Sequence, residues 1–402
     1  MSYKFPKGFL WGTATSSHQI EGDNTNNDWW EAEENGLVPH KSGRACDSYN
    51  RYEEDFDLAK AMHNNAYRFS IEWSRVEPEV GKFSEEAIEH YRKILQALRA
   101  RGLEPFVTLH HFANPIWFAK LGGWTNKKAP EYFARYARKI AEELGEMANY
   151  WVTINEPIIV VLHGYLKGFW PPFNKKNILG WFGALANMAE AHKRAYRMLH
   201  NGNPNARVGS SQAINWYTPA HSGLVGALES LVIPPAKFFK DRWFLGKTIE
   251  YHDFIGIQYY SRYKVSFTHG SSHDEREERS DFGWEIYPRG IYQVVREIYK
   301  RYKKPIYITE NGISDADDDQ RPAFIKDHLG WLHQAIEEGA DVRGYFYWSL
   351  LDNFEWAEGF TQKFGLVEVD FATFERKMRP SGKLYSEICR NSGFPGGLTK
   401  IE

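Results

Sequence analysis

The chain has 402 residues, of which 42% are hydrophobic and 25% charged, and its net charge is -2 at pH 7. These values are ordinary for a soluble protein with a large core, and they give no indication of a nucleic-acid partner or of binding to an acidic membrane surface. The length fits two or three average domains or one large α/β barrel.

The sequence carries no sign of export or membrane insertion. The first residues, Met1 to Gly8, lack the apolar core of a signal peptide, and no apolar run is long enough to cross a bilayer. Cys46 and Cys389 stand far apart and show neither a disulfide framework nor metal-ligand spacing. We therefore expect a reducing, cytoplasmic location and no membrane partner.

Strand-like and helix-like segments alternate along the chain without a low-complexity linker, which predicts βα units around a parallel sheet. Eight units favour a single (β/α)8 barrel over residues 1–402, in preference to a doubly wound sheet. The predicted strands, rich in β-branched and aromatic residues, are Phe9–Ser16, Ala66–Ile71, Pro105–His111, Tyr150–Asn155, Arg207–Ala213, Phe254–Tyr260, Pro305–Thr309 and Arg343–Ser349.

The segments between the strands differ in regularity. Apolar residues at helical spacing predict helices over 126–145, 183–200 and 321–338. The segments 220–246 and 265–284 are less regular. The second holds the charge run 274–281, which we interpret as a solvated loop or an exposed helix.

Polar and aromatic residues stand at or near the carboxyl ends of most predicted strands. Active sites of βα barrels form at that face from the ends of several strands, so this placement indicates a site rather than a stability role. The residues are Gln19, Arg68, His111, Asn155, Glu156, Gln258, Tyr260, Glu310 and Trp348.

Two glutamates close buried strands, Glu156 in Ile154-Asn-Glu-Pro157 and Glu310 in Ile308-Thr-Glu-Asn-Gly312. Burying a lone carboxylate is costly. A structural pairing with Arg68 would account for one glutamate but not for both. Two carboxylates facing one pocket, about 5–5.5 Å apart, are what a retaining glycosidase needs.

Asn155 and the histidine pair His110-His111 each allow two interpretations. Asn155 could end its strand, or its amide could donate to a sugar hydroxyl beside the reacting carbon; its place next to Glu156 favours the second. His110 and His111 resemble a metal pair, but adjacent strand residues face opposite sides, so we expect only His111 to reach the barrel mouth. No further cluster has metal-ligand spacing, and we predict no metal.

Aromatic residues are abundant, with 15 Trp, 23 Tyr and 26 Phe. Most must serve the core, but Trp348 and Trp356 flank a polar segment that also holds Glu355. Indole rings stack on sugar faces, and a carboxylate accepts two hydroxyl hydrogen bonds, so this segment indicates a sugar clamp. No glycine-rich phosphate loop occurs, and we expect no cofactor.

Taken together, these segments resemble glycoside hydrolase family one, the β-glucosidase and β-galactosidase family. Five motifs carry the resemblance in order, and Gly164–Pro172 resembles its archaeal-type branch. The motifs are Phe9-Leu-Trp-Gly-Thr-Ala-Thr-Ser-Ser-His-Gln-Ile-Glu-Gly22, Tyr67-Arg-Phe-Ser-Ile-Glu-Trp-Ser-Arg75, Thr153-Ile-Asn-Glu-Pro157, Ile308-Thr-Glu-Asn-Gly312 and Trp348-Ser-Leu-Leu-Asp-Asn-Phe-Glu-Trp356.

The resemblance implies a (β/α)8 barrel in which Glu310 is the nucleophile and Glu156 the acid/base. It implies that Arg68 and Tyr260 tune the nucleophile, and that Trp348 is the platform under the sugar. The remaining sugar-binding residues would be Gln19, His111, Asn155, Glu355 and Trp356.

The chain departs from the family pattern in three ways. Gln258 stands where Asn is usual before Tyr-Tyr, which affects the tuning of the nucleophile. Phe112-Ala113 replaces Trp-Asp after the histidine, which removes one hydrogen bond near the sugar. The chain is also short, so we expect a more open aglycone side around 220–246 and 265–284.

We therefore predict a retaining exo-β-glycosidase, most simply a β-glucosidase, acting on a β-glycoside or small oligosaccharide, with the possibility of a homo-oligomer. The alternatives are a 6-phospho-β-glycosidase and a non-catalytic sugar-binding homologue. The second would typically lack one glutamate. A thioglucosidase would typically carry Gln in place of Glu156, and a metal-dependent hydrolase would need clustered His and Asp ligands.

Overall fold

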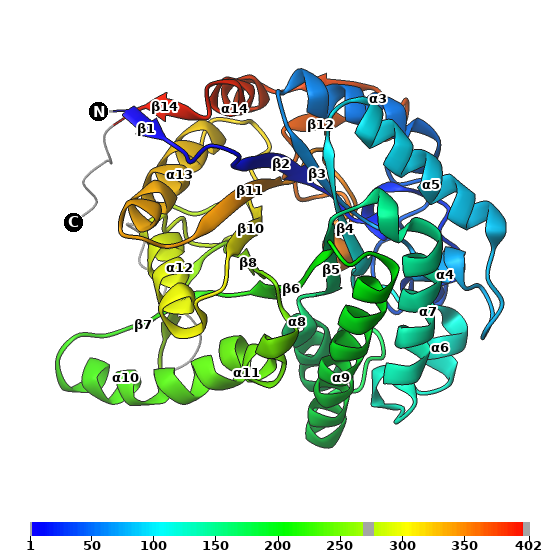
Figure 1. Cartoon of the computed structure of the whole chain (residues 1–402). Coiled ribbons are helices and arrows are strands. Elements are labelled where there is room, and N and C mark those ends of the chain that lie inside the picture. The colour runs from blue at the N-terminus through cyan, green and yellow to red at the C-terminus, as the bar shows by residue number, and fades with distance from the viewer. Residues whose placement is uncertain (1, 268–276, 397–402) are drawn as a thin grey trace.

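A computed structural model of the chain describes residues 2–267 and 277–396. Eight parallel strands close into a barrel in the order β10-β11-β2-β3-β4-β5-β6-β8, and helices surround it (Figure 1). The predicted (β/α)8 barrel is confirmed. The barrel strands are β2 (Leu10–Ala14), β3 (Ala66–Ser70), β4 (Glu104–His110), β5 (Tyr150–Asn155), β6 (Arg207–Ala213), β8 (Ile255–Gln258), β10 (Ile306–Asn311) and β11 (Val342–Trp348).

The eight predicted strands all occur, and those at 150–155 and 207–213 have the predicted bounds. The barrel interior is filled by large rings. Phe106 of β4 lies 4.8 Å from Phe346 of β11 and 5.5 Å from Tyr307 of β10, measured between ring centroids. These rings fill the barrel below its mouth, so the carboxyl ends of the strands are the open end.

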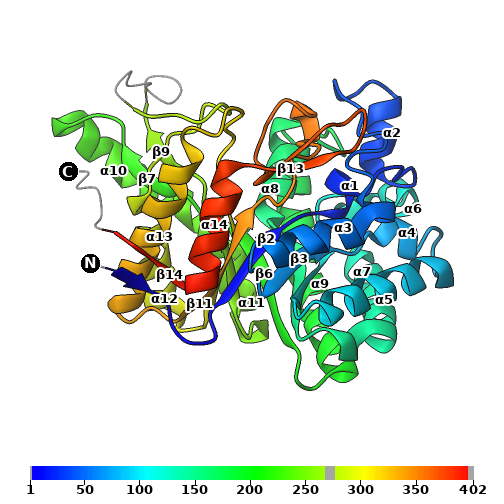
Figure 2. The ribbon, with the colours of Figure 1, turned by 90° about the horizontal axis from the view of Figure 1, so that it is seen from above.

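Fourteen α-helices lie in the described part of the chain, and most cover the outside of the barrel (Figure 2). Helix α7 buries its apolar face, including Phe133, Ile140 and Leu144, as its spacing predicts. The helices are α1 (Ser17–Ile20), α2 (Asp28–Glu34), α3 (Ser48–Ala61), α4 (Trp73–Val76), α5 (Glu85–Ala100), α6 (Ile116–Lys120), α7 (Ala129–Leu144), α8 (Pro157–Val161), α9 (Ile178–Gly202), α10 (Gly223–Lys237), α11 (Trp243–Thr248), α12 (Arg289–Tyr302), α13 (Arg321–Glu337) and α14 (Pro380–Asn391).

The segment 220–246 differs from the prediction, because it is largely helical. It contains α10, a π-helical turn at Phe238–Arg242 and most of α11. Pro234 and Pro235 lie inside α10, and the residues that α10 buries include Glu229 and Lys237. Prolines and inward-facing charges both oppose the usual helical pattern, which accounts for the missed helix.

Three two-stranded sheets complete the described part of the fold. Strand β1 (Ser2–Lys4) pairs antiparallel with β14 (Gly393–Pro395), β7 (Trp216–Pro219) pairs parallel with β9 (Arg262–Val265), and β12 (Val367–Val369) pairs antiparallel with β13 (Arg376–Met378). Among the described residues, no helix has both the length and the apolar character to span a membrane. The charge run 274–281 lies partly outside the described residues; within them, Glu277 pairs with Lys264 and Arg279.

Candidate active site

A cavity of about 330 Å³ opens at the carboxyl ends of the barrel strands. It gathers residues from motifs that are more than 300 positions apart in sequence. The predicted residues that line it are Gln19, His111, Asn155, Glu156, Gln258, Tyr260, Glu310, Trp348, Glu355 and Trp356. Arg68 is fully buried and contacts the site through its guanidinium group.

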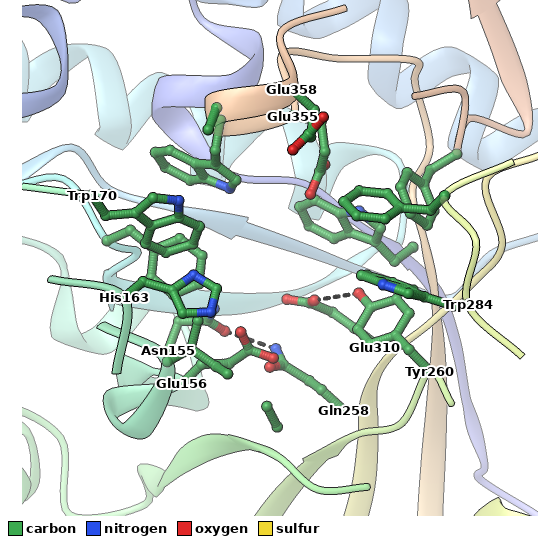
Figure 3. Close-up of a pocket in the computed structure, with 18 of the residues that line it drawn as sticks. Asn155, Glu156, His163, Trp170, Gln258, Tyr260, Trp284, Glu310, Glu355 and Glu358 are labelled. Atoms are coloured by element: carbon green, nitrogen blue, oxygen red, sulfur yellow. Dashed lines mark hydrogen bonds between the residues drawn. The ribbon is translucent and has the colours of Figure 1, made fainter. Parts of the chain in front are cut away.

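Glu156 stands where β5 ends and α8 begins. Its backbone is left-handed, with φ 42° and ψ 59°, and its carbonyl accepts the amide of Ile159, which starts the helix. Pro157 occupies the first helical turn, where a missing amide hydrogen is tolerated. A non-glycine residue in this conformation is strained by about 1–3 kcal/mol, and such strain clusters at functional sites. The turn directs the carboxyl group into the cavity (Figure 3).

Glu310 lies across the cavity from Glu156, at the end of β10 (Figure 3). Arg68 Nη1 donates to Glu310 Oε1, and the Tyr260 hydroxyl donates to Oε2 at 2.7 Å. Both oxygens of Glu310 therefore accept a hydrogen bond, one of them from a cation. No hydrogen bond to the Glu156 carboxyl is seen among the described residues.

The two carboxyl groups have different electrostatic surroundings. Burial raises the pKa of Glu156 well above its usual range, and the charge of Glu310 raises it further. Burial also raises the pKa of Glu310, but the charge of Arg68 and the hydrogen bonds from Tyr260 and Arg68 oppose this shift. Glu310 therefore loses its proton first, and Glu156 keeps its proton to higher pH.

Asn155 is held by a network beneath the two glutamates. Its Oδ1 accepts from Arg68 Nη2 at 2.6 Å and from Gln258 Nε2 at 2.7 Å. Its Nδ2 consequently faces the cavity side, 3.3 Å from His111 Nε2. Gln258, the departure from the family pattern, thus reaches Asn155, while its own Oε1 is buried without a partner among the described residues.

His110 and His111 diverge as the strand alternation predicts. His111 lines the cavity, whereas His110 packs against Trp124 and Phe133 and hydrogen-bonds Asn114 at 3.0 Å. The two histidines therefore do not form a metal pair.

A second wall of the cavity is formed by Gln19, from the N-terminal part of the chain, and by the segment 348–356, from the C-terminal part. Gln19, in α1, donates from Nε2 to Glu355 Oε2 at 3.2 Å. Burial raises the pKa of Glu355 to about 8, and the charge of Glu310 contributes. The His111 ring lies nearly parallel to Trp348 and to Trp356, at 5.9 and 6.1 Å between centroids. These flat surfaces border a space suited to a pyranose ring.

Several residues that line the cavity had no role in the sequence prediction. Phe112, noted in the sequence only as a departure from the family pattern, packs against Trp170 and Trp356, each at 5.0 Å between ring centroids. Trp284 packs on Tyr260 at 5.3 Å between ring centroids and follows the charge run, which gave no hint of a contact with the cavity. The others include His163, Phe169, Tyr263, Phe282 and Glu358. They come from loops, from short helical turns at 162–167 and 356–358 and from the four-residue strand β9, which are too short for hydrophobic periodicity to give a clear signal.

One group of carboxylates in the described chain has oxygens close enough to share a cation, namely Asp315, Asp317 and Asp319, within 4.8 Å of one another. The group lies outside the cavity. Asp315 Oδ2 accepts the backbone amides of Gln320 and Arg321, which cap the start of α13. A structural role accounts for this carboxylate.

Comparisons with known proteins agree with the geometry. Residues 1–255 and 248–394 match the model described as Glycosyl hydrolase family 1. Beta-glucosidase A of Thermotoga maritima is 34% identical, covering 97% of this chain and 98% of the relative. A 6-phospho-beta-galactosidase of Staphylococcus haemolyticus is 32% identical over 96% of this chain and 99% of the relative. The solved beta-glycosidase from Pyrococcus horikoshii has a TM-score of 0.92 and 42% identity, covering 100% of this chain and 98% of that one.

Proposed function

Because this chain belongs to glycosyl hydrolase family 1, we propose that it is a retaining exo-β-glycosidase whose preferred substrate is a β-glucoside. The observation that carries the proposal is the pair of glutamates facing one cavity, of which only Glu310 is held by Arg68 and Tyr260. A retaining mechanism needs one ionised and one protonated carboxyl group, and these surroundings supply both.

The chemical roles follow from the two environments. Glu310, ionised beside Arg68, attacks the anomeric carbon, while Glu156 donates its proton to the glycosidic oxygen and releases the aglycone. Glu156, now ionised, removes a proton from water, and the water displaces Glu310 from the glycosyl-enzyme intermediate. Two inversions at one carbon leave the product with the β configuration of the substrate.

The remaining cavity residues hold the terminal sugar. Trp348 forms the platform under the ring, and Glu355 accepts two hydroxyl hydrogen bonds. Asn155 Nδ2, which lies 3.3 Å from His111 Nε2, can donate to the hydroxyl next to the reacting carbon, and this hydrogen bond strengthens as charge develops there. Gln19, His111 and Trp356 bind the outer hydroxyls.

A second candidate is hydrolysis of 6-phosphorylated glycosides, since one relative is a 6-phospho-beta-galactosidase. The half-buried Glu355 argues against it, because a phosphate beside this group would either bring two anions together or require the Glu355 carboxyl, whose pKa burial raises to about 8, to stay protonated. We also infer one catalytic domain over 1–402 and a cytoplasmic location, which the free, buried Cys46 and Cys389 support.

The experiment that tests the roles is chemical rescue. Glu310→Gly should not hydrolyse aryl β-glucosides, and added azide should attack from the vacated side to give an α-glycosyl azide. Glu156→Ala with azide should give the β-glycosyl azide, because Glu310 still forms the intermediate. NMR of the products distinguishes the anomers; a β product from Glu310→Gly and an α product from Glu156→Ala would reverse the assignment.

A further inference from the structure

Helix α10 has its polarity reversed. Apart from Ser230, its exposed residues are apolar, and they include Leu224 and Leu231, which are 79% and 71% exposed, while Glu229 is fully buried. A helix on a protein surface normally turns its apolar stripe to the core and its charges to water. The exposed large apolar residues of α10 and the turn after it are Leu224, Val225, Leu228, Leu231, Val232, Phe238 and Phe239.

The buried charges of α10 have partners that fix this orientation. Glu229 accepts the backbone amides of Ala220 and His221 at 3.0 Å and pairs with the His221 ring at 2.8 Å. Lys237 pairs with Glu297 of α12 at 2.5 Å. These contacts hold the polar side of α10 against the protein, so the leucines on its other side face outward.

The apolar surface continues from α10 onto the start of α9. Phe182 of α9 lies 6.2 Å from Phe239 between ring centroids, and Phe239 lies 5.2 Å from Phe238. Ile178 and Leu179 add side chains that are 60% and 86% exposed. We call this set of α10 and α9 residues the α10 face. Figure 2 shows α10 beside β7 and β9 at the edge of the molecule.

The exposed charged residues in the segments that form the α10 face are basic. Lys175 and Lys176 precede Ile178 and are exposed, as is Lys240, which follows Phe239. Across the segments 164–188 and 216–245 the only acidic residues are Glu229 and Asp241, and both are buried. An apolar surface with a cationic rim has the composition of a helix that lies in a membrane interface.

We propose that the α10 face binds the surface of an anionic lipid bilayer. The leucines and phenylalanines would enter the boundary between headgroups and acyl chains, and the lysines would pair with anionic headgroups. A second copy of the chain fits less well, because a symmetric contact would bring the same basic residues together. This inference goes beyond the proposed function and does not depend on it.

The bound orientation would place the active-site cavity close to the lipid. Lys240 Nζ lies 5.5 Å from the centre of the Tyr263 ring, and Tyr263 lines the cavity. The net charge of the chain gave no indication of this surface, because the net charge is close to zero and these lysines are concentrated at one place on the surface. The proposal departs from the sequence-based expectation of no membrane partner, and it concerns surface binding, since no described helix could span a membrane.

Vesicle sedimentation tests the proposal. The full chain is mixed with phosphatidylcholine vesicles, with or without added phosphatidylglycerol, and the bound fraction is measured. We expect binding to the anionic vesicles to be stronger by about tenfold or more, from the charges of several lysines. The variant Leu224→Gln/Leu228→Gln/Leu231→Gln should lose binding to both, and Lys175→Gln/Lys176→Gln should lose only the preference for anionic lipid.

A matched control uses exposed apolar residues elsewhere. Leu37, Val80 and Leu121 are 58%, 47% and 45% exposed and lie outside the α10 face. The triple glutamine variant at these positions should bind vesicles like the wild type, and all variants should keep wild-type activity on a soluble aryl glucoside. The proposal is overturned if the wild type binds neither vesicle, if both lipids bind equally, if the control loses binding as well, or if the α10 variant only dissociates an oligomer in light scattering.

Discussion

At the scale of single residues, Glu156 and Glu310 differ in what stabilises their charge. Of the two glutamates, only Glu310 accepts hydrogen bonds from Arg68 and Tyr260, so the raised pKa of Glu156 makes it the proton donor. Activity should fall at high pH as Glu156 loses its proton, and at low pH as Glu310 gains one. The pH profile of activity is therefore bell-shaped. Both of its limbs are properties of the coupled pair, and the upper, alkaline limb is due mostly to Glu156.

The variant Glu156→Gln should lose the upper limb of the pH profile, because the amide does not titrate. Aryl glucosides with poor leaving groups should lose about 10²–10⁴-fold in rate, and substrates with activated leaving groups far less. The measurement is kcat/KM from acid to alkaline pH with both kinds of substrate. Survival of the upper limb in this variant would show that another group controls it.

Glu355 should discriminate against phosphorylated sugars. A 6-phosphate carries roughly −1.5 to −2 charge, and it would meet the half-buried Glu355 carboxyl, whose pKa burial raises to about 8, with no Arg or Lys in the segment 352–358 to offset the charge. The ratio of kcat/KM for p-nitrophenyl β-glucoside to that of its 6-phosphate should therefore exceed about 10²-fold. Glu355→Ser should reduce this ratio. A better rate with the phosphate would place the chain among the phosphoglycosidases.

At the scale of elements, the turn after β10 depends on close backbone packing. A Cβ atom built on Gly312 would lie 1.7 Å from the carbonyl oxygen of Trp348, in the adjacent strand β11. Gly312→Ala would therefore push apart two strands that carry Glu310 and Trp348. We expect a loss of about 1–3 kcal/mol in stability and a marked fall in kcat.

Gly183→Ala is the matched control for this substitution. Gly183 lies inside α9, where an added Cβ meets no atom within 4 Å. The change should be neutral or stabilising by about 0.5–1 kcal/mol, because alanine favours a helix. Thermal unfolding of both variants distinguishes the effects; equal melting temperatures would mean that the strands adjust without cost.

The success of the sequence prediction varied by element for physical reasons. Barrel strands are buried on both faces, so their β-branched and aromatic runs are unambiguous, and the residues at their ends could be placed in one cavity. Trp284 and Trp170 come from irregular loops whose path depends on tertiary contacts. Helix α10 was missed because its charges face inward, which is the reverse of the pattern used to find helices.

At the scale of the whole molecule, buried carboxyl groups couple stability to pH. Burial raises the pKa of Asp241 to about 8, and its two oxygens lack a hydrogen-bond partner among the described residues. Burial likewise raises the pKa of Glu21 and of Asp28 to about 7. These groups bind more protons in the folded state than in the unfolded state between about pH 4 and pH 8, so stability should fall as pH rises through this window.

The variant Asp241→Asn should flatten this dependence. At pH 5 both side chains are uncharged and the melting temperatures should be similar, whereas at pH 8 the variant should be more stable by about 1–3 kcal/mol. Calorimetry at the two pH values measures the difference. Glu142→Gln, at a site whose side chain is 61% exposed, should keep the wild-type slope. An unchanged slope in Asp241→Asn would assign the pH dependence to other groups.

The pairing of β1 with β14 makes the polypeptide nearly circular. Ser2 lies opposite Pro395 in this sheet, so the first and last described strands are neighbours (Figure 1). A short peptide joining Gly396 to Ser2 would leave every barrel strand in place, and the chain could then be opened elsewhere. The exposed turn at Glu79–Lys82, outside the cavity lining, is a suitable point. Such a permuted enzyme would begin in the loop between α4 and α5 and keep the same arrangement of cavity residues.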